Sequence, residues 1–469
     1  MNWDDTIAAV STPLGTGGLG VIRVSGPEAV SVVDRVFRSP RGRSGILKGT
    51  AGYRARYGQI VRPSTGEVLD TVIATVFRAP RSFTGEDTVE LSCHGGVYLL
   101  KTVLELLLEN GARMAEPGEY TKRAFLNGRM DLSQAESVMD VIGAKTDRAL
   151  KAAEQRLSGG LGRRIEELQK GLMDLLVLLE VQIDYPEYEI EEAEQVDFLR
   201  ELESLKDRVR RLYRTADTGR MLSEGARVVL CGRPNMGKST LMNALLGDDR
   251  AIVTAEPGTT RDTLEEGLNL NGIPVRLIDT AGLREADSLA EKLGVERARR
   301  AVEEADIVLF MLSADERMTA DDEALLQEIQ NRPHLVLRTK TDLLKEKTGE
   351  TGQEPAAAEP AGTEADTLRI SAETGEGMDA LRERLGEMLL SGAAEATDGI
   401  YLANVRQKEA VFRTLSALER AVETWHAGVG TDMVSLDVME AYDALGEVTG
   451  TTVREGLTDA IFSRFCLGK

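Results

Sequence analysis

The stretch GRPNMGKS, residues 232–239, decides how the rest of this chain is organised. It follows the apolar run 228–231 and precedes the mostly apolar segment 241–245, so it is predicted to join a β-strand to a helix. In that context the G-x-x-x-x-G-K-[ST] pattern forms a loop whose backbone N–H groups surround a phosphate. Lys238 would reach the outer phosphates, and Ser239 would place its hydroxyl on magnesium. The alternative, a chance glycine turn, is disfavoured by the strand and helix that flank the loop.

Two segments further along resemble the switches of a GTPase. Thr259 and Thr260 lie in a GTTRD segment, where a threonine hydroxyl would close onto magnesium when the terminal phosphate is present. A DTAG segment then ends a predicted strand. Asp279 would face the outer shell of the magnesium, and the Gly282 N–H would lie near the terminal phosphate.

A base-binding loop is predicted at TKTD, residues 339–342, which follows another strand. There Asp342 would accept two hydrogen bonds from guanine, and the segment 371–372 would support the base from its other side. Thr339 stands where the common N-K-x-D pattern has asparagine. Its shorter side chain is expected to weaken the ties between the base loop and the phosphate loop, and therefore guanine affinity.

The group that orients the attacking water is not the usual glutamine, because Leu283 occupies that position. Glu285, Asp287 and Glu291 follow, and any of these carboxylates would hold the water directly or through a second one. The alternative is a solvated charged face, and the residues leave both readings open. No arginine is clearly placed as an in-chain finger. Asn235 would offer a carbonyl oxygen to a monovalent cation there, or is simply a turn residue.

Composition bounds the class of protein. A chain of 469 residues should hold about three domains. No apolar run approaches the ~18 residues of a membrane span, and the acidic start MNWDD argues against secretion. Three scattered cysteines favour a reducing cytoplasm. The net charge of −21 disfavours indiscriminate nucleic-acid binding. A basic run at 206–220 would contact RNA, or would be a solvated helix face that balances the acidic stretch 187–197.

Apolar periodicity divides the chain into four segments, and we predict a multidomain protein. The segments are an α+β N-terminal domain at 1–118, the first part of a discontinuous α-helical domain at 119–217, an inserted α/β P-loop GTPase domain at 218–385, and the second helical part at 386–469. Strands are expected at 6–10, 20–24, 53–61, 71–77, 88–93, 227–231, 275–279, 307–312, 335–338 and 368–370, and a helix at 97–108. Ser133 and Glu136 predict a capping box. Segment 346–366 is predicted to be a disordered insertion.

These motifs, together with CHGG at 93–96, SFTGED at 82–87 and the terminal FCLGK at 465–469, closely resemble the tRNA-modification GTPase family known as MnmE or TrmE. The resemblance covers the whole chain. It implies GTP hydrolysis that drives, with an FAD-dependent partner of the MnmG type, addition of an aminomethyl-type group to carbon five of the wobble uridine in tRNA. It also implies a homodimer held by the N-terminal domains and no membrane association.

The resemblance assigns metal ligands at the nucleotide site. Asn235 would bind potassium, with the loop 254–259 closing over the ion; Ser239 and Thr260 would bind magnesium; Glu291 would position water. Metal contacts are thereby expected at Ser239, Thr260, Asn235, Thr254, Glu256 and Thr259. Nucleotide contacts are expected at Gly232, Asn235, Met236, Gly237, Lys238, Ser239, Thr240, Thr254, Gly258, Thr259, Thr260, Asp279, Gly282, Lys340, Asp342, Ser371 and Ala372.

The resemblance also implies a site for 5-formyltetrahydrofolate, or a related folate, in the N-terminal domain. The matching positions are Arg23, Glu90 and Lys469, while Arg129 stands where some relatives have lysine, which keeps the charge but not the geometry. Without the resemblance, surface ion pairs would explain both arginines. Cys466 would act near the modification chemistry if its thiolate were stabilised, and a buried structural cysteine is the alternative.

The sequence leaves a second class of function to weigh, a ribosome-assembly or RNA-binding switch GTPase without modification chemistry. The N-terminal domain and the Cys466 terminus favour the enzyme. A scaffold with a vestigial nucleotide site is opposed by the intact set of Lys238, Ser239, Thr260 and Asp342. Binding of folate would separate the enzyme from both alternatives. His94, His334 and His426 have no partner that the sequence makes visible, and no chemistry is assigned to them.

Overall fold

Residues 5–185, 192–249, 265–279, 299–344, 367–390, 399–452, 457–463, 465–466 and 468 are described by a computed structural model of the chain. The predicted insertion 346–366 lies outside these residues. The chain divides into two units, one formed by Met1–Met139 with Gly446–Lys469 and the other by Asp140–Leu445. Among the described residues, no helix combines the length and apolarity that a membrane span needs.

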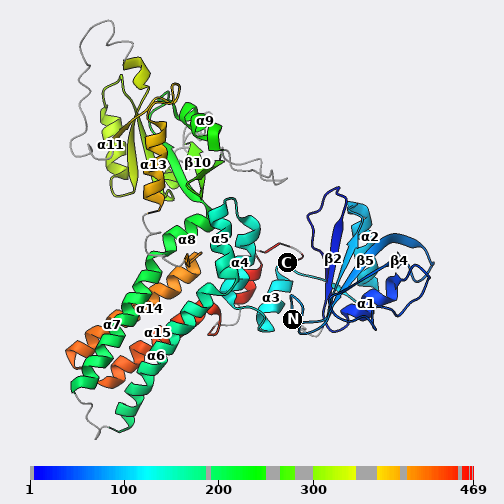
Figure 1. Ribbon diagram of the computed structural model, residues 1–469. Helices are drawn as coiled ribbons and strands as arrows, with labels where there is room; N and C mark the ends of the chain where they lie inside the picture. The colour runs from blue at the N-terminus through cyan, green and yellow to red at the C-terminus, as the bar shows by residue number, and fades with distance from the viewer. Residues whose placement is uncertain are drawn as a thin grey trace. The chain divides into compact units, whose positions relative to one another are not determined.

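The first unit contains a seven-stranded sheet in the order β3-β4-β5-β6-β2-β1-β7, and helices α1 and α2 share a core with one of its faces (Figure 1). Neighbouring strands run antiparallel, except for β1 and β7. The elements are β1 (Ile7–Val10), β2 (Gly20–Ser25), α1 (Ala29–Val36), β3 (Phe37–Arg38), β4 (Arg54–Val61), β5 (Val68–Phe77), β6 (Thr88–Cys93), α2 (Val97–Glu109) and β7 (Arg113–Met114).

The strands and the helix predicted for this segment are confirmed, with ends that differ by a few residues. Strands β3 and β7 were not predicted because two residues are too few to show a period. Helix α1 was missed because its sequence AVSVVDRV is rich in valine, which by itself favours a strand.

The C-terminal segment packs within the first unit. Leu132 and Ala135 share a buried cluster with Phe462 and Phe465. Gly118 allows this approach, because its φ is +69° and a Cβ there would lie 2.4 Å from the Phe462 carbonyl oxygen. The elements involved are α3 (Glu119–Leu126), α4 (Leu132–Gly143) and α16 (Leu457–Phe462).

The predicted capping box of α4 was two residues out of register. Asp131 accepts a hydrogen bond from the Gln134 N–H at 2.8 Å, and the Gln134 side chain accepts one from the Asp131 N–H at 3.0 Å. The reciprocal pair is therefore Asp131 with Gln134, rather than Ser133 with Glu136. The same S/T/D-x-x-E/Q spacing occurs twice in this stretch, and only the helix start decides between them.

Long helices of the second unit run side by side (Figure 1). Phe198 of α7 stacks on Trp425 of α14 with ring centroids 4.4 Å apart, and Gln169 of α6 donates to the Tyr442 carbonyl of α15 at 3.2 Å. The elements are α5 (Asp147–Leu157), α6 (Gly160–Asp184), α7 (Glu192–Arg214), α8 (Ala216–Glu224), α14 (Val405–Ala427) and α15 (Thr431–Thr449).

At least three of the six basic side chains in the run 206–220 pair with acids. Arg208 pairs with Glu167, Arg210 with Glu419, and Arg220 with Asp306. These pairs favour the reading of a solvated, charge-balanced helix face over that of an RNA-binding patch.

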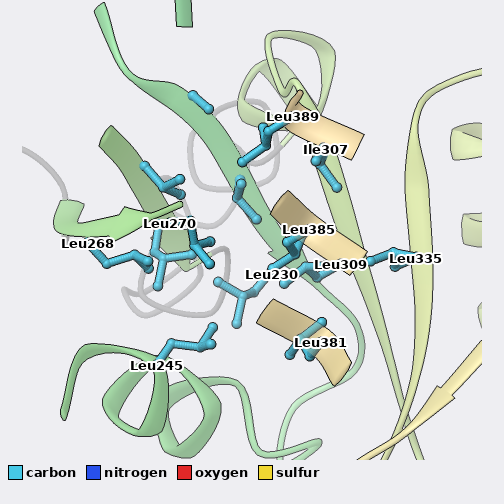
Figure 2. Close-up of a cluster of buried hydrophobic side chains, with 14 of the residues drawn as sticks. Leu230, Leu245, Leu268, Leu270, Ile307, Leu309, Leu335, Leu381, Leu385 and Leu389 are labelled. Atoms are coloured by element: carbon cyan, nitrogen blue, oxygen red, sulfur yellow. The ribbon is translucent and has the colours of Figure 1, made fainter. Parts of the chain in front are cut away.

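A six-stranded sheet in the order β13-β12-β11-β8-β10-β9 completes the second unit, with β9 antiparallel to β10 and the other neighbours parallel. Figure 2 shows Leu381, Leu385 and Leu389 of α13 within a cluster that includes strand residues Leu230 and Leu309. The elements are β8 (Ala226–Cys231), α9 (Lys238–Asp249), β9 (Glu265–Leu270), β10 (Ile273–Asp279), β11 (Ile307–Ser313), α11 (Ala320–Ile329), β12 (His334–Thr339), β13 (Thr367–Arg369) and α13 (Met378–Leu389).

Both faces of this sheet are covered, which explains the continuous apolar strands. In β11, Leu309 and Met311 belong to one buried cluster, whereas Val308, Phe310 and Leu312 belong to another. The five strands predicted here are confirmed, with ends that differ by up to two residues. The edge strand β9, of sequence EEGLNL, was missed because it is too polar for that pattern.

Candidate nucleotide-binding site

The predicted phosphate loop, Asp279 and the predicted base loop lie at one edge of the six-stranded sheet. Strands β8, β10, β11 and β12 are parallel, so their carboxyl ends meet there. Asp279 pairs in register with Leu230, just before the phosphate loop, and Ser313 pairs with Thr339, which begins the base loop. Segments separated by more than a hundred residues therefore converge at this edge.

The phosphate loop, residues 232–239, adopts backbone conformations that favour glycine at two of its positions. Gly232 has φ +149°, and a Cβ there would lie 2.6 Å from the Met311 carbonyl oxygen of β11. Gly237 and the exposed Asn235 also have positive φ values, of +87° and +67°. Lys238 is 5% exposed, and its Nζ donates to the carbonyls of Gly232 at 2.8 Å and Arg233 at 2.7 Å. The ammonium is thus held within the loop, where it would meet a phosphate.

Oxygen ligands suited to magnesium lie beside this loop. Ser239 Oγ donates to Asp279 Oδ2 at 3.3 Å, and Asp279 is buried at the end of β10. A hydroxyl and a carboxylate are ligands that magnesium prefers, together with phosphate oxygens. Ser239, a predicted magnesium ligand, and Asp279, predicted to face the outer shell of the ion, are therefore neighbours, and Thr240 is exposed next to them.

The base-binding residues are joined to one another. Ser371 Oγ donates to Asp342 Oδ1 at 2.6 Å, which orients the carboxylate predicted to bind guanine. The Thr341 N–H donates to the Ile370 carbonyl at 3.4 Å, so the two loops are also tied through their backbones. Lys340 has φ +60°, and Ala372 begins the turn after Ser371.

Thr339 ties the base loop to the phosphate loop in spite of its short side chain. Its Oγ1 donates to the Met236 carbonyl at 2.9 Å and lies 3.2 Å from the Leu312 carbonyl. Thr339 therefore keeps a tie between the two loops, and the weakening of that tie relative to asparagine stays a prediction. The base loop approaches closely enough for a threonine hydroxyl to span the gap.

We expect Thr339→Val to weaken guanine-nucleotide affinity about fivefold, because one buried hydrogen bond contributes about 1 kcal/mol. Titration with a fluorescent GDP analogue measures the change. Thr341→Val is the matched control, since the Thr341 hydroxyl is buried without a hydrogen-bond partner among the described residues. Equal affinities for the two variants would contradict the assigned tie.

The first unit holds a second predicted site around Arg23. Arg23 Nε donates to Glu90 Oε1 at 2.9 Å, and its guanidinium lies 5.5 Å from the ring centroids of both Phe83 and Tyr120. The Tyr120 hydroxyl donates to the Arg23 carbonyl at 2.7 Å, and burial raises the pKa of that phenol. Arg129 lies against Gly85, in the loop that also carries Phe83. The structure thus brings Arg23 and Glu90 together in a partly aromatic setting.

The three cysteines differ in environment. Cys466 is exposed, and its carbonyl accepts a hydrogen bond from the Gly118 N–H at 3.4 Å. Cys231 is buried. Burial and the nearby Asp70 carboxylate raise the pKa of the Cys93 thiol to about 12, which makes it a poor nucleophile. The alternative of a buried Cys466 is therefore wrong, because its side chain is accessible.

The sequence missed a side-chain contact between His94 and Asp70. His94 Nδ1 lies 2.5 Å from Asp70 Oδ1, and the His94 N–H donates to Asp70 Oδ2 at 2.9 Å. Asp70 shares the buried face of β5 with Val72 and Ala74. The position of Asp70 on the core-facing side of a strand was the signal in the sequence, because a buried carboxylate needs a hydrogen-bond partner.

Several predicted residues lie outside the described parts of the chain, and the structure gives no geometry for them. They are Thr254, Glu256, Gly258, Thr259, Thr260, Gly282, Leu283, Glu285, Asp287, Glu291 and Lys469.

Comparison with known proteins identifies the family. The family model for the MnmE helical domain matches residues 132–466, and that for the GTP-binding protein TrmE N-terminus matches residues 6–129. The tRNA modification GTPase MnmE of Geobacillus kaustophilus strain HTA426 is 45% identical over 466 residues, which cover 99% of both chains. That of Desulforamulus reducens strain MI-1 is 44% identical over 468 residues, covering 99% of this chain and 100% of the relative. The chain therefore belongs to the MnmE family of tRNA modification GTPases, also named TrmE.

Proposed function

We propose that this chain hydrolyses GTP to drive, with an FAD-dependent partner, formation of an aminomethyl-type group at carbon five of the wobble uridine in tRNA. The observation that carries the proposal is that one edge of the six-stranded sheet holds Lys238, the Ser239–Asp279 pair and the Asp342–Ser371 pair. We call it the nucleotide edge. The full-length similarity to tRNA modification GTPases supports the substrate class. No observation favours the alternative of an RNA-binding switch without modification chemistry.

Each residue of this edge has a part in the proposed reaction. Backbone N–H groups of the phosphate loop and Lys238 would bind the phosphates, and Asp342 would select guanine. Ser239 and Thr260 would hold magnesium, with Asp279 facing its outer shell, while Asn235 and the segment 254–259 would hold potassium. When bound, these cations neutralise charge on the phosphates. Glu291 would hold the attacking water in place.

The proposal extends to the architecture and the second site. We take the GTPase domain to be inserted in a discontinuous helical domain, and two chains to associate through their N-terminal domains. The Arg23–Glu90 pair supports a folate site, because a guanidinium beside aromatic rings suits a ligand that has both carboxylates and a flat ring. Arg129 and Lys469 belong to the same proposed folate site, and Cys466 would act near the modification chemistry.

GTP turnover in potassium and in sodium, at matched ionic strength, tests the hydrolytic mechanism. We expect faster turnover in potassium, and loss of turnover in Glu291→Ala with nucleotide still bound. Glu285→Gln and Asp287→Asn are the matched controls, and both should keep the potassium response. Equal rates in the two salts with an unaffected Glu291→Ala would overturn the mechanism and favour a switch that awaits an external activator.

The hairpin β9–β10 could transmit a structural change from the nucleotide edge of the sheet to helix α5. Its strand β10 ends at Asp279, beside Ser239, and its far end is a tight turn at Asn271 and Gly272, with φ values of +51° and +86°. Thr146, the residue that caps α5, donates its hydroxyl to the Gly272 carbonyl at 2.6 Å. A displacement at Asp279 would therefore be passed along a short, paired hairpin to α5.

We expect Thr146→Val to keep GTP turnover but to lower tRNA modification in a reaction reconstituted with the partner enzyme. Asn404→Ala is the matched control, because Asn404 caps a different helix, α14, through the same kind of bond. Each variant loses about 1 kcal/mol of cap stabilisation. Equal modification rates in both variants would exclude the hairpin as the route.

A further inference from the structure

We infer that Arg233 is a positioning residue of the phosphate loop, held by the buried Asp322 of α11. The inference rests on the proposed function and adds to it a residue that tunes nucleotide affinity. Arg233 occupies the second position of the loop, which the G-x-x-x-x-G-K-[ST] pattern leaves unspecified. Nothing in the pattern alone requires a charged side chain there.

The geometry joins the loop to the start of a helix nearly a hundred residues away. Arg233 Nε donates to Asp322 Oδ1 at 3.0 Å, and a terminal guanidinium nitrogen donates to Glu316 Oε2 at 2.9 Å. The two acids differ in setting, because the Asp322 side chain is 1% exposed and that of Glu316 is 48% exposed. Solvent screens the second pair far more than the first.

Asp322 is itself fixed by the capping box of α11. Its Oδ2 accepts from the Thr319 N–H at 3.0 Å and from the Thr319 hydroxyl at 2.8 Å, while the Thr319 Oγ1 accepts from the Asp322 N–H. One oxygen of the carboxylate is therefore committed to the helix start, and the other faces Arg233. A carboxylate held in this way gives the guanidinium a fixed anchor.

The anchor acts on the phosphate-binding lysine through the backbone. The carbonyl that accepts the Lys238 ammonium at 2.7 Å belongs to Arg233, whose side chain Asp322 restrains. On its other side, Gly232 packs against the Met311 carbonyl of β11. Fixing both flanks of this peptide would keep the loop in the shape that receives phosphate, which lowers the ordering cost of binding.

The contact predicts an effect on affinity rather than on the chemical step. Asp322→Asn keeps an acceptor for Thr319 and removes the charge that faces Arg233. We expect it to raise the dissociation constant for GDP and the KM for GTP about tenfold, with kcat changed by less than about twofold, because a loosened loop must be ordered again each time a nucleotide binds. Glu316→Gln should have a smaller effect.

The experiment titrates the full-length chain with a fluorescent GDP analogue and measures kcat and KM for GTP, with thermal unfolding in parallel. The variants are Arg233→Met, Arg233→Lys, Asp322→Asn and the double variant Arg233→Met with Asp322→Asn. Glu387→Gln breaks the exposed pair with Arg384 in the same domain and is the matched control. Arg233→Lys keeps the charge but not the fork-shaped donor, and should recover only part of the affinity.

The outcomes separate the inference from the proposed function. A double variant that is no weaker than either single variant supports a direct pair. Variants with lower unfolding temperatures but unchanged GDP affinity would overturn the inference, because the pair would then be merely structural. Variants that bind GDP as tightly as Glu387→Gln would also overturn it. Failure of the parent itself to bind GDP would instead refute the proposed function.

Discussion

Replacement of Asp342 by asparagine is expected to lower guanine-nucleotide affinity by about a thousandfold and to shift preference towards xanthosine nucleotides. The ionised carboxylate would accept hydrogen bonds from the guanine N1–H and exocyclic amine, each worth about 1.5–3 kcal/mol. An asparagine amide turns one of these acceptors into a donor, which would face the exocyclic amine. Xanthine carries a carbonyl oxygen at that position, so the amide would then find an acceptor.

Titration with fluorescent GDP and XDP measures this exchange. Ser371→Ala is the comparison, because it leaves the carboxylate in place and removes only the 2.6 Å bond that orients it. We expect about a tenfold loss for GDP in that variant, with no gain for XDP, since the charge of Asp342 is unchanged. If Asp342→Asn retained the affinity of the parent for GDP, the base-binding assignment would be wrong.

Local patterns in the sequence predicted most of the nucleotide edge. The phosphate loop and the residues after β10 and β12 follow apolar strands, and parallel strands bring such residues to one edge whatever the rest of the chain does. Strand β9 was missed because an edge strand with a polar face lacks the apolar run of the central strands. Helix α1 was missed because packing against the sheet overrides the preference of its valines.

Contacts between residues that are distant in the chain could not be predicted from the sequence. Nothing near Arg233 indicates Asp322, and nothing near His94 indicates Asp70, because each pair is made by topology rather than by spacing. Thr339 also shows that the distance between two loops cannot be judged from the sequence. Its short side chain predicted a weaker tie, whereas the bond that Thr339 makes to the Met236 carbonyl depends on how closely the two loops approach.

A network of ion pairs around the buried Arg123 in the first unit is another such set of contacts. Arg123 is 2% exposed and pairs with Asp5 at 2.6 Å, Glu119 at 3.0 Å and Glu86 at 3.1 Å. Arg113 also donates to Glu119 and Asp5. Hydrogen bonds from Arg113 and Arg123 hold the pKa of Asp5 below its ordinary value, despite burial. Burial alone would raise the pKa of Glu119, but its hydrogen bonds from Arg113, a backbone N–H and Arg123 lower it.

We expect Arg123→Met to destabilise the first unit by about 3–5 kcal/mol at pH 7, because removing one partner leaves buried carboxylates with too little positive charge. Arg62→Met, which breaks a more exposed pair with Glu67, should cost no more than about 1 kcal/mol. Urea unfolding of both variants and the parent measures the difference.

The pH dependence of that difference distinguishes a charge effect from a packing defect. Because the folded pKa values of Asp5 and Glu119 are lowered, their stabilisation of the parent is full above about pH 4–5 and is lost as the pH falls through the folded values. In Arg123→Met, the buried Glu119 carboxylate loses one of the positive charges that stabilise it, so the pKa of Glu119 rises. Protonation of Glu119 at mildly acidic pH then removes the unfavourable buried charge and lessens the destabilisation of the variant. The gap between parent and variant should therefore be widest at pH 7 and should narrow towards pH 4. A gap that stays constant over this range would mean that Arg123 contributes through the packing of its side chain rather than through its charge.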